Sequence, residues 1–262
     1  MYNQGILKGK RILITGISSK SSIAFGIAKA MYQQGANLAF SCKTNKLKNK
    51  ISLFSSELGS SIVIPCDVDK DQDIKDLFKK LSNIWINFDG FVHSIAYAEK
   101  CNLHGDFVDT ISKDIFQTAH NISSYSFIAM AKECKKMLNK NASLVTLTYE
   151  GSQKVIPYYN IMGLAKASLE ANVRYMAYTL GENMIRVNAI SAGPISTTSS
   201  YSIKDFKKIF NFSKLISPMR KLVTSKEIGN TAAFLCSDLS KGITGQVIYV
   251  DGGVNISKIN IS

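Results

Sequence analysis

Two tyrosines and a lysine in the middle of the chain have the residue types and the spacing for oxyanion or acid–base chemistry. Tyr149 directly follows an apolar, strand-like run at residues 143–148, and Tyr159 precedes Lys166 by seven residues. Pro157 suits the first turn of a helix, so the spacing predicts that Tyr159 and Lys166 share one helix face, two turns apart. Tyr149 is expected at the carboxyl end of a strand, the edge where open α/β sheets bind ligands. Two phenols and one ammonium could therefore converge on a single ligand.

The alternative interpretation of this group is structural. Tyr and Lys two turns apart also occur on amphipathic helices in which the phenol packs and the ammonium is solvated. On this spacing alone the structural interpretation is the more common one. The elements that surround the three residues must decide between the two.

Those elements alternate between apolar strands and helices. We expect strands near residues 9–16, 36–42, 61–66, 89–96, 143–148, 185–191 and 246–250, and helices near 23–31, 46–58, 71–85, 111–138, from 157 onward and at 225–236. The strands are apolar runs more than alternating ones, which favours a mainly parallel sheet covered on both faces. No linker or repeat divides the chain, so a single domain over residues 1–262 is predicted. The less regular segment 197–223 is the expected lid.

Composition and charge exclude several classes of protein. The 262 residues are 45% hydrophobic and 19% charged, as in an ordinary globular protein. The net charge of +13 comes from 28 Lys and only 4 Arg, spread over most predicted helices. Nucleic-acid readers favour Arg for bidentate contacts, so no nucleic-acid partner is expected, and no apolar run approaches the ~20 residues of a membrane helix. Five scattered cysteines and an N-terminus without a signal pattern predict a cytoplasmic protein.

The turn after the first predicted strand has a geometry that binds phosphate. The strand ends on Gly16, a polar turn covers residues 17–22, and a helix begins near Ile23 with Ser22 or Ser21 as its N-cap. Free backbone N–H groups and the helix dipole would point at this turn. The stretch matches neither a P-loop nor G-x-G-x-x-G. A purely structural turn is therefore an equally open interpretation.

Taken together, the chain resembles the short-chain dehydrogenase/reductases, and more narrowly the bacterial NADH-dependent enoyl-acyl-carrier-protein reductases. The motifs that carry this resemblance are residues 16–24, 66–68, 89–95, 160–175, 186–194 and 250–253. The tyrosine spacing is the most specific of them: carbonyl-reducing members place Tyr four residues before Lys, whereas Tyr159 stands seven before Lys166 and Tyr149 is a second tyrosine. The resemblance implies a Rossmann-type, doubly wound α/β fold with a seven-stranded, mainly parallel sheet and helices on both faces.

The resemblance also implies a reaction, namely reduction of the trans-2 double bond of enoyl thioesters, the last step of each fatty acid elongation cycle. Hydride transfer to the β-carbon moves negative charge to the thioester oxygen, further from the nicotinamide than in a ketone. One additional helical turn, about 5.4 Å, would place the hydrogen-bond donor accordingly. Tyr159 is implied to stabilise the enolate, Lys166 to hold the nicotinamide ribose, and Tyr149 to lie close to the acyl chain.

A set of cofactor and substrate contacts is implied in the same way. The pyrophosphate, adenosine and nicotinamide would meet Gly16, Ser22, Ile23, Asp67, Val68, Ile95, Ile195, Ser196, Thr197, Thr198 and Ser199, and the acyl substrate would meet Ala98. No metal site is expected, because His93, His104 and His120 lack ligand spacing. These histidines are interpreted as structural.

Lys43 departs from the pattern at the end of the second strand. Dinucleotide folds usually carry an acid there for the ribose 2′-OH, and a cation could instead bind the 2′-phosphate of NADPH. In a chain this rich in lysine, a solvated Lys43 is slightly favoured. We therefore expect NADH use, with NADPH as an alternative donor.

The expected partner is acyl carrier protein, and the family suggests a homotetramer. Lys204, Lys207 and Lys208 lie at helical spacing in the expected lid, where they could dock an acidic carrier or simply face solvent. Two other functions compete: a ketoacyl or other carbonyl reductase, which the tyrosine spacing disfavours, and a non-catalytic dinucleotide sensor, which would not need both tyrosines and the lysine.

Overall fold

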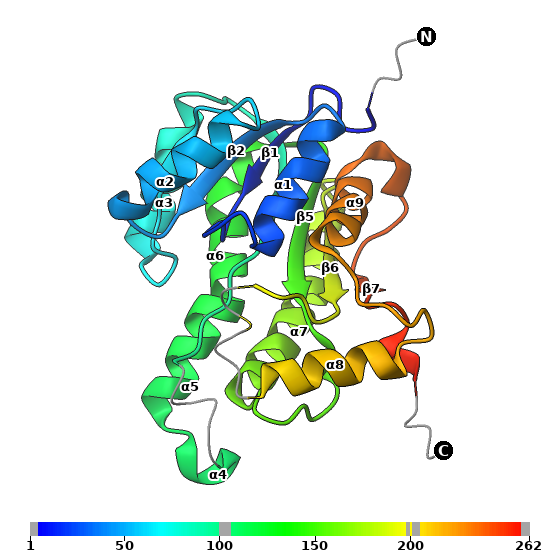
Figure 1. The fold of residues 1–262 in the computed structure, drawn as a ribbon. Coiled ribbons are helices and arrows are strands. Elements are labelled where there is room, and N and C mark those ends of the chain that lie inside the picture. Colours follow the sequence, from blue (N-terminus) through cyan, green and yellow to red (C-terminus); the bar gives the residue numbers. More distant parts are fainter. Residues whose placement is uncertain (1–4, 100–105, 198–199, 201–204, 258–262) are drawn as a thin grey trace.

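A seven-stranded parallel sheet forms the middle of the molecule. The computed structural model describes residues 5–99, 106–197, 200 and 205–257. The strands are β1 (Arg11–Ile14), β2 (Asn37–Cys42), β3 (Val63–Pro65), β4 (Phe88–His93), β5 (Leu138–Thr148), β6 (Arg186–Ala192) and β7 (Val247–Val250). Their order is β3-β2-β1-β4-β5-β6-β7, and every neighbouring pair is parallel. The predicted doubly wound α/β fold is confirmed (Figure 1).

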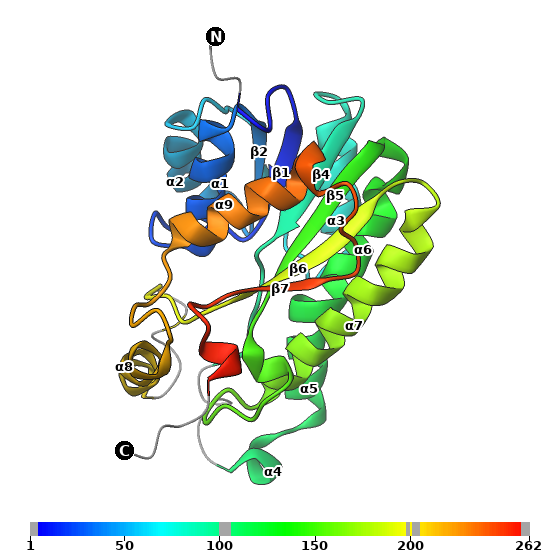
Figure 2. The ribbon, with the colours of Figure 1, turned by 90° about the vertical axis from the view of Figure 1, so that its right-hand side faces the viewer.

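Helices cover both faces of this sheet. They are α1 (Ile23–Gln33), α2 (Asn45–Ser56), α3 (Asp71–Ser82), α4 (Phe107–Thr110), α5 (Lys113–His120), α6 (Ser126–Cys134), α7 (Ile161–Gly181), α8 (Phe206–Ile216) and α9 (Ser225–Cys236). Figure 2 shows α1, α2 and α9 on one face and α3, α6 and α7 on the other. The crossover helices thus bury both faces, as parallel sheets require.

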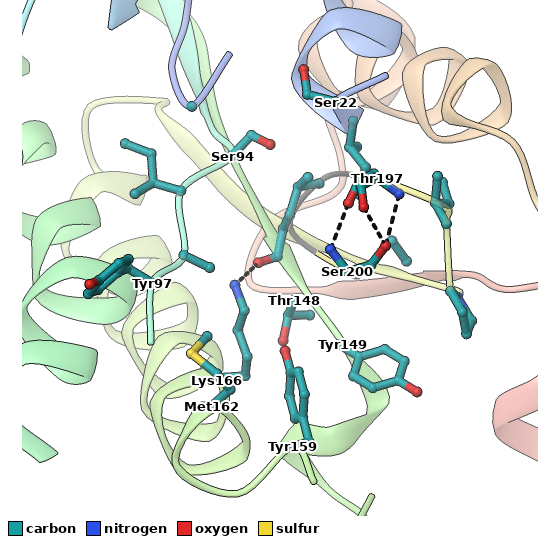
Figure 3. Close-up of a pocket in the computed structure, with 18 of the residues that line it drawn as sticks. Ser22, Ser94, Tyr97, Thr148, Tyr149, Tyr159, Met162, Lys166, Thr197 and Ser200 are labelled. Atoms are coloured by element: carbon teal, nitrogen blue, oxygen red, sulfur yellow. Dashed lines mark hydrogen bonds between the residues drawn. The ribbon is translucent and has the colours of Figure 1, made fainter. Parts of the chain in front are cut away.

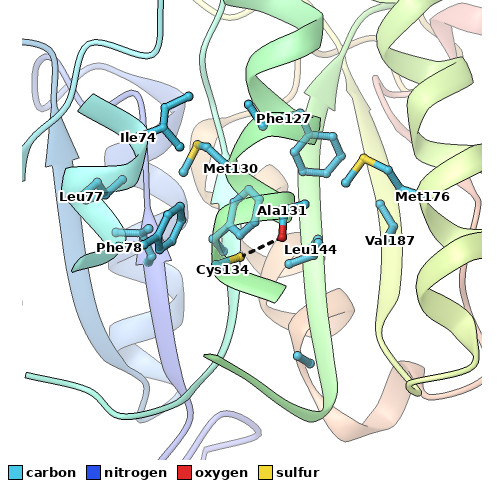
Figure 4. Close-up of a cluster of buried hydrophobic side chains, with 14 of the residues drawn as sticks. Ile74, Leu77, Phe78, Phe127, Met130, Ala131, Cys134, Leu144, Met176 and Val187 are labelled. Atoms are coloured by element: carbon cyan, nitrogen blue, oxygen red, sulfur yellow. Dashed lines mark hydrogen bonds between the residues drawn. The ribbon is translucent and has the colours of Figure 1, made fainter. Parts of the chain in front are cut away.

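Successive strand residues supply the two cores in alternation, because side chains of a strand point to opposite faces. In β1, Ile12 and Ile14 pack under α1 and α9, whereas Leu13 packs under α3 and α6. The second of these cores contains Phe127 of α6 and Leu144 of β5, with the other side chains drawn in Figure 4. This packing fixes the carboxyl ends of the central strands.

The long helix predicted at residues 111–138 is interrupted. The structure has α5, then one wide turn of π-helix at Asn121–Tyr125, then α6 and a short 3-10 turn at Lys135–Met137. Strand β5 already begins at Leu138, which pairs with Phe88. A π-turn is a rare single-turn insertion within a helical run, and no residue type marks it, which explains why the sequence indicates one continuous helix.

The predicted helical start at Pro157 is wrong. Helix α7 begins at Ile161, and residues 157–160 form turns. Tyr158 has φ 63° and Asn160 has φ 38°, values that a right-handed helix excludes. Tyr159 therefore stands in a tight turn ahead of the helix that carries Lys166.

Among the described residues, no helix has the length and apolar character needed to cross a membrane. Within the segment 197–223, the described part contains α8, whose Phe206 is buried. The role of this segment as a lid stays a prediction.

Candidate active site

A cavity of about 660 Å³ opens at the carboxyl ends of β1, β4, β5 and β6. In doubly wound sheets this edge is where ligands bind. The cavity is lined from five directions: the glycine turn, the exit of β4, the exit of β5, the start of α7 and the segment after β6. Figure 3 shows Tyr149, Tyr159 and Lys166 around it, together with Ser22 and Ser94.

The glycine turn is built for a close backbone approach. Gly16 has φ +78°, and a Cβ placed there would lie 1.9 Å from the carbonyl oxygen of Ser94. Only glycine fits such a position. Ser22 caps α1 by accepting a hydrogen bond from the N–H of Phe25, as predicted for one of its two candidate caps. Ser22 and Ile23 line the cavity, so the N-terminus of α1 faces it, with no acidic residue in its first turn.

Tyr149 and Tyr159 lie edge to face at the other end of the cavity. Their ring centroids are 5.0 Å apart and the rings are inclined by 76°. Gly151 makes this approach possible, because a Cβ there would lie only 2.6 Å from Cδ1 of Tyr159. Burial raises the pKa of both phenols, and nearby groups reinforce the effect. Both hydroxyls are therefore protonated hydrogen-bond donors at neutral pH.

Lys166 is buried beside them with 5% of its surface exposed. Its Nζ donates to the carbonyl oxygen of Leu147 at 2.7 Å (Figure 3). Burial lowers the pKa of Lys166 to about 8, and the nearby Glu170 acts in the opposite direction. The ammonium is thus mostly charged at neutral pH, with protons left to donate to a ligand.

His93 lies behind the site, on β4, and is fully buried. Its Nδ1 pairs with Oγ1 of Thr146 at 3.0 Å and its Nε2 with Oγ of Ser126 at 2.8 Å. Burial, with a contribution from the charge of Lys166, lowers the pKa of His93 to about 3. The imidazole is neutral and ties two strands to α6, a structural arrangement. His120 lies with Nδ1 2.9 Å from the carbonyl oxygen of Phe116, and His104 lies outside the described residues.

The structure brings most predicted site residues together. Those that line the cavity are Gly16, Ser22, Ile23, Ile95, Ala98, Tyr149, Tyr159, Lys166, Ile195 and Thr197. Ser196 stands next to this lining without being part of it, and Thr198 and Ser199 lie outside the described residues.

Lys43, Asp67 and Val68 lie apart from this lining, at the ends of the strands β2 and β3. Nζ of Lys43 is 3.9 Å from Oδ2 of Asp67 and 5.5 Å from the ring centroid of Tyr97. Tyr97 itself lines the cavity. The lysine therefore stands at the outer edge of the site, with an anion and an aromatic face as neighbours.

Sequence reasoning missed the apolar wall of the cavity. Met162 of α7 and Phe206 and Ile209 of α8 line it. No motif marks these residues, and only the helical spacing of Phe206 and Ile209 could have paired them on one face.

The cavity fits a dinucleotide beside an apolar chain. The glycine cradle and the N-terminus of α1 suit a pyrophosphate, and the ammonium of Lys166 suits ribose hydroxyls. The apolar side chains near the two phenols leave room for an aliphatic group. No group of three or more His, Cys, Asp or Glu side chains within the described residues is arranged to hold a metal ion.

Comparison with known proteins identifies the relatives of this chain. A sequence model of the family described as enoyl-(acyl carrier protein) reductase matches residues 16–255. A curated enoyl-(acyl-carrier-protein) reductase (NADH) from Buchnera aphidicola subsp. Baizongia pistaciae is 59% identical over 98% of this chain and 99% of its own length. Its counterpart from Escherichia coli K12 is 54% identical over 98% of each chain.

Solved structures show the same similarity. The crystal structure of the enoyl-(acyl-carrier-protein) reductase (NADH) from Aquifex aeolicus superposes with a TM-score of 0.94 at 44% identity, covering 96% of this chain and 98% of the other. The enoyl-acyl carrier protein reductase from Bacillus cereus, solved with NADP+ and indole naphthyridinone, gives a TM-score of 0.94 at 41% identity. It covers 97% of this chain and all of its own.

Proposed function

This chain belongs to the enoyl-(acyl-carrier-protein) reductase family, and we propose that Tyr149, Tyr159 and Lys166 are the residues with which it works. The reaction is reduction of the trans-2 double bond of an enoyl thioester carried by acyl carrier protein, the last step of each fatty acid elongation cycle. The observation that carries this assignment is the convergence of two protonated phenols and a buried ammonium on one cavity beside a glycine cradle.

The three residues act on the charge that develops in the substrate. NADH, held in the glycine cradle and by Lys166, would supply the hydride for the β-carbon, and negative charge would then develop on the thioester oxygen. The hydroxyl of Tyr159 donates a hydrogen bond to that oxygen, and this interaction is strongest in the transition state. Lys166 holds the ribose hydroxyls, and its positive charge favours the enolate. Transfer of one proton to the α-carbon, from a site phenol that is reprotonated by water or from water itself, would complete the saturated thioester.

Tyr149 gives the site its second donor. Its ring stands 5.0 Å from that of Tyr159, and its hydroxyl remains protonated because burial raises its pKa. We assign it to the wall beside the acyl chain. Met162, Phe206 and Ile209 supply the apolar surface for that chain.

We assign the dinucleotide to the residues predicted from the sequence, with Lys43 at the outer edge of the site. Gly16, Ser22 and Ile23 hold the pyrophosphate and adenosine side, and Ile95 and residues 195–199 hold the nicotinamide half. Asp67 and Val68 meet the adenine. NADH is the preferred donor, because Lys43 already has Asp67 and Tyr97 as neighbours. A 2′-phosphate would compete with that arrangement, and NADPH is the weaker alternative.

The remaining assignments concern the lid and the assembly. The segment 197–223 closes over the acyl chain, and Phe206 of α8 supports this by facing the cavity.

A homotetramer is supported by the large exposed aromatic residues of α7, Tyr175 and Tyr178, which are 78% and 89% exposed. The four described cysteines are unpaired, which suits a reducing cytoplasm.

One assay separates this function from its competitors. Oxidation of NADH is followed with crotonyl thioester, with acetoacetyl thioester and with neither. The proposal expects turnover with the crotonyl thioester only. Turnover of the acetoacetyl thioester alone would establish a carbonyl reductase, and binding of NADH without turnover of either would establish a sensor.

A further inference from the structure

Glu170 is a buried carboxylate just outside the cavity, on the same helix as Lys166. Only 4% of its surface is exposed, and it does not line the cavity. Its Oε1 accepts hydrogen bonds from Oγ1 of Thr148 at 2.7 Å and from Oγ of Ser152 at 2.5 Å. Its Oε2 accepts from Nε2 of Gln153 at 3.3 Å. A buried carboxylate with this many donors is held in one place.

These donors stand on both sides of Tyr149. Thr148 is the last residue of β5, and Ser152 ends the 3-10 turn Glu150–Ser152 that follows the tyrosine. Lys166 binds the preceding carbonyl, that of Leu147, at 2.7 Å. Lys166 and Glu170, four residues apart on α7, are therefore hydrogen-bonded to two consecutive residues at the end of β5. This fixes the strand exit that carries Tyr149 against the helix that carries Lys166.

Glu170 also supplies a negative charge that compensates the buried positive charge of Lys166. It raises the pKa of Lys166 against the effect of burial. The backbone carbonyl of Glu170 accepts from Nη1 of Arg174 at 3.2 Å, one turn further along α7.

The other titratable groups around Lys166 and Tyr149 already have partners or are neutral. His93 on β4 is neutral and bonded to two hydroxyls. Glu150 pairs with Lys154 at 3.4 Å, and Asp251 accepts from the N–H groups of Gly253 and Asn255 at 2.8 Å each. Tyr149, Tyr159 and Tyr249 have pKa values raised by burial and are protonated.

We propose that Glu170 is a positioning residue of the reductase: it clamps the Tyr149 segment to α7 and places a buried carboxylate one helical turn from the Lys166 ammonium. This inference rests on the proposed role of Lys166. Without the carboxylate, Lys166 would lose its proton at lower pH, and the Tyr149 segment would lose its anchor.

The test is the pH profile of kcat/KM for NADH and crotonyl thioester, measured for the parent and for Glu170→Gln. Glutamine keeps the size and an acceptor oxygen but removes the charge. Loss of one negative charge a helical turn from Lys166 should move the high-pH limb down by about one pH unit. Glu170→Asp keeps the charge, and we expect it to restore the position of the limb.

Matched controls separate charge from loosening of the helix. Glu182→Gln removes an exposed carboxylate at the end of α7 and should leave the limb in place. Ser152→Ala removes one hydrogen bond of the clamp without changing charge, and should lower kcat without moving the limb. A limb that does not move in Glu170→Gln, or that moves as far in Glu182→Gln, overturns the proposal.

Two further measurements test the inference if the variant does not fold or if the parent does not reduce the crotonyl thioester. If Glu170→Gln yields no folded protein, Ser152→Ala decides: an unchanged kcat overturns the clamp. If the parent itself does not reduce the crotonyl thioester, the proposed function fails. The titration of Lys166 is then followed through the pH dependence of NADH binding, by fluorescence, in parent and variant, and equal profiles overturn the inference.

Discussion

Gly151→Ala moves the ring of Tyr159 without touching its hydroxyl, and therefore tests how finely the site depends on position. A Cβ at residue 151 would lie 2.6 Å from Cδ1 of Tyr159, about 0.8 Å short of the 3.4 Å at which ordinary contact begins. The backbone of Gly151 has no positive φ, so alanine is locally compatible there. Because the backbone of Tyr159 is fixed in a turn between Tyr158 and Asn160, the ring itself must move away from the added methyl, which would also lie 3.3 Å from Cδ1 of Tyr149.

A displacement approaching 1 Å typically lowers a catalysed rate by about 100-fold, equivalent to about 2.7 kcal/mol of transition-state stabilisation. We expect kcat for crotonyl thioester to fall by that order, while the KM for NADH stays within about twofold. The overpacking should lower stability by about 1–3 kcal/mol. Gly181→Ala, on α7 with nothing within 4 Å of the new Cβ, is the matched control. An unchanged kcat in Gly151→Ala would refute the reasoning.

Three further predictions follow from the charges of the site. The pKa of Lys166, lowered to about 8 by burial, lies below its unfolded value near 10.4, so the unfolded chain binds more protons between these values and stability rises with pH there. Urea unfolding should show the parent gaining about 2 kcal/mol relative to Lys166→Met from pH 8 to pH 10, and equal slopes would contradict this. Lys43→Gln should leave kcat/KM for NADH within about twofold and lower it for NADPH; the preference for NADH would be disproved by a parent that favours NADPH more than about tenfold, or ~1.4 kcal/mol. Of the three lysines predicted to dock the carrier, Lys204 lies outside the described residues, and Lys207 and Lys208 are exposed at the start of α8. Reversing the charges of Lys207 and Lys208 should raise KM for the carrier-borne substrate and spare a coenzyme A thioester, and equal effects on both would dismiss carrier docking.

The order of the elements could be predicted because the core pattern is strong. Largely apolar runs such as residues 12–14 and 144–147 are buried in the structure, and near-continuous runs of this kind are typical of parallel strands covered on both faces. The helix cap at Ser22 and the turn at Gly16 could also be predicted, since few other residue types suit those positions. The family predicted from these motifs is confirmed.

The local geometry of the site could not be predicted, because it depends on backbone conformations that are unusual for the residue types at those positions. Tyr158 and Asn160 adopt positive φ, a conformation that residues other than glycine rarely take. The same holds for the early start of β5, whose first residues include the polar Asn139 and Lys140. Contacts between distant segments, such as Glu170 with Ser152, appear only once the chain is folded.

The central claim is that the hydroxyl of Tyr159 stabilises the negative charge formed on the thioester oxygen. The most direct measurement is kcat for Tyr159→Phe with NADH and crotonyl thioester, beside Tyr32→Phe, which alters a phenol of α1 that is 44% exposed. Loss of one such donor should lower kcat by about 100- to 1000-fold, with NADH affinity and the Tyr32→Phe rate unchanged. A Tyr159→Phe enzyme that turns over as fast as the parent would contradict the account.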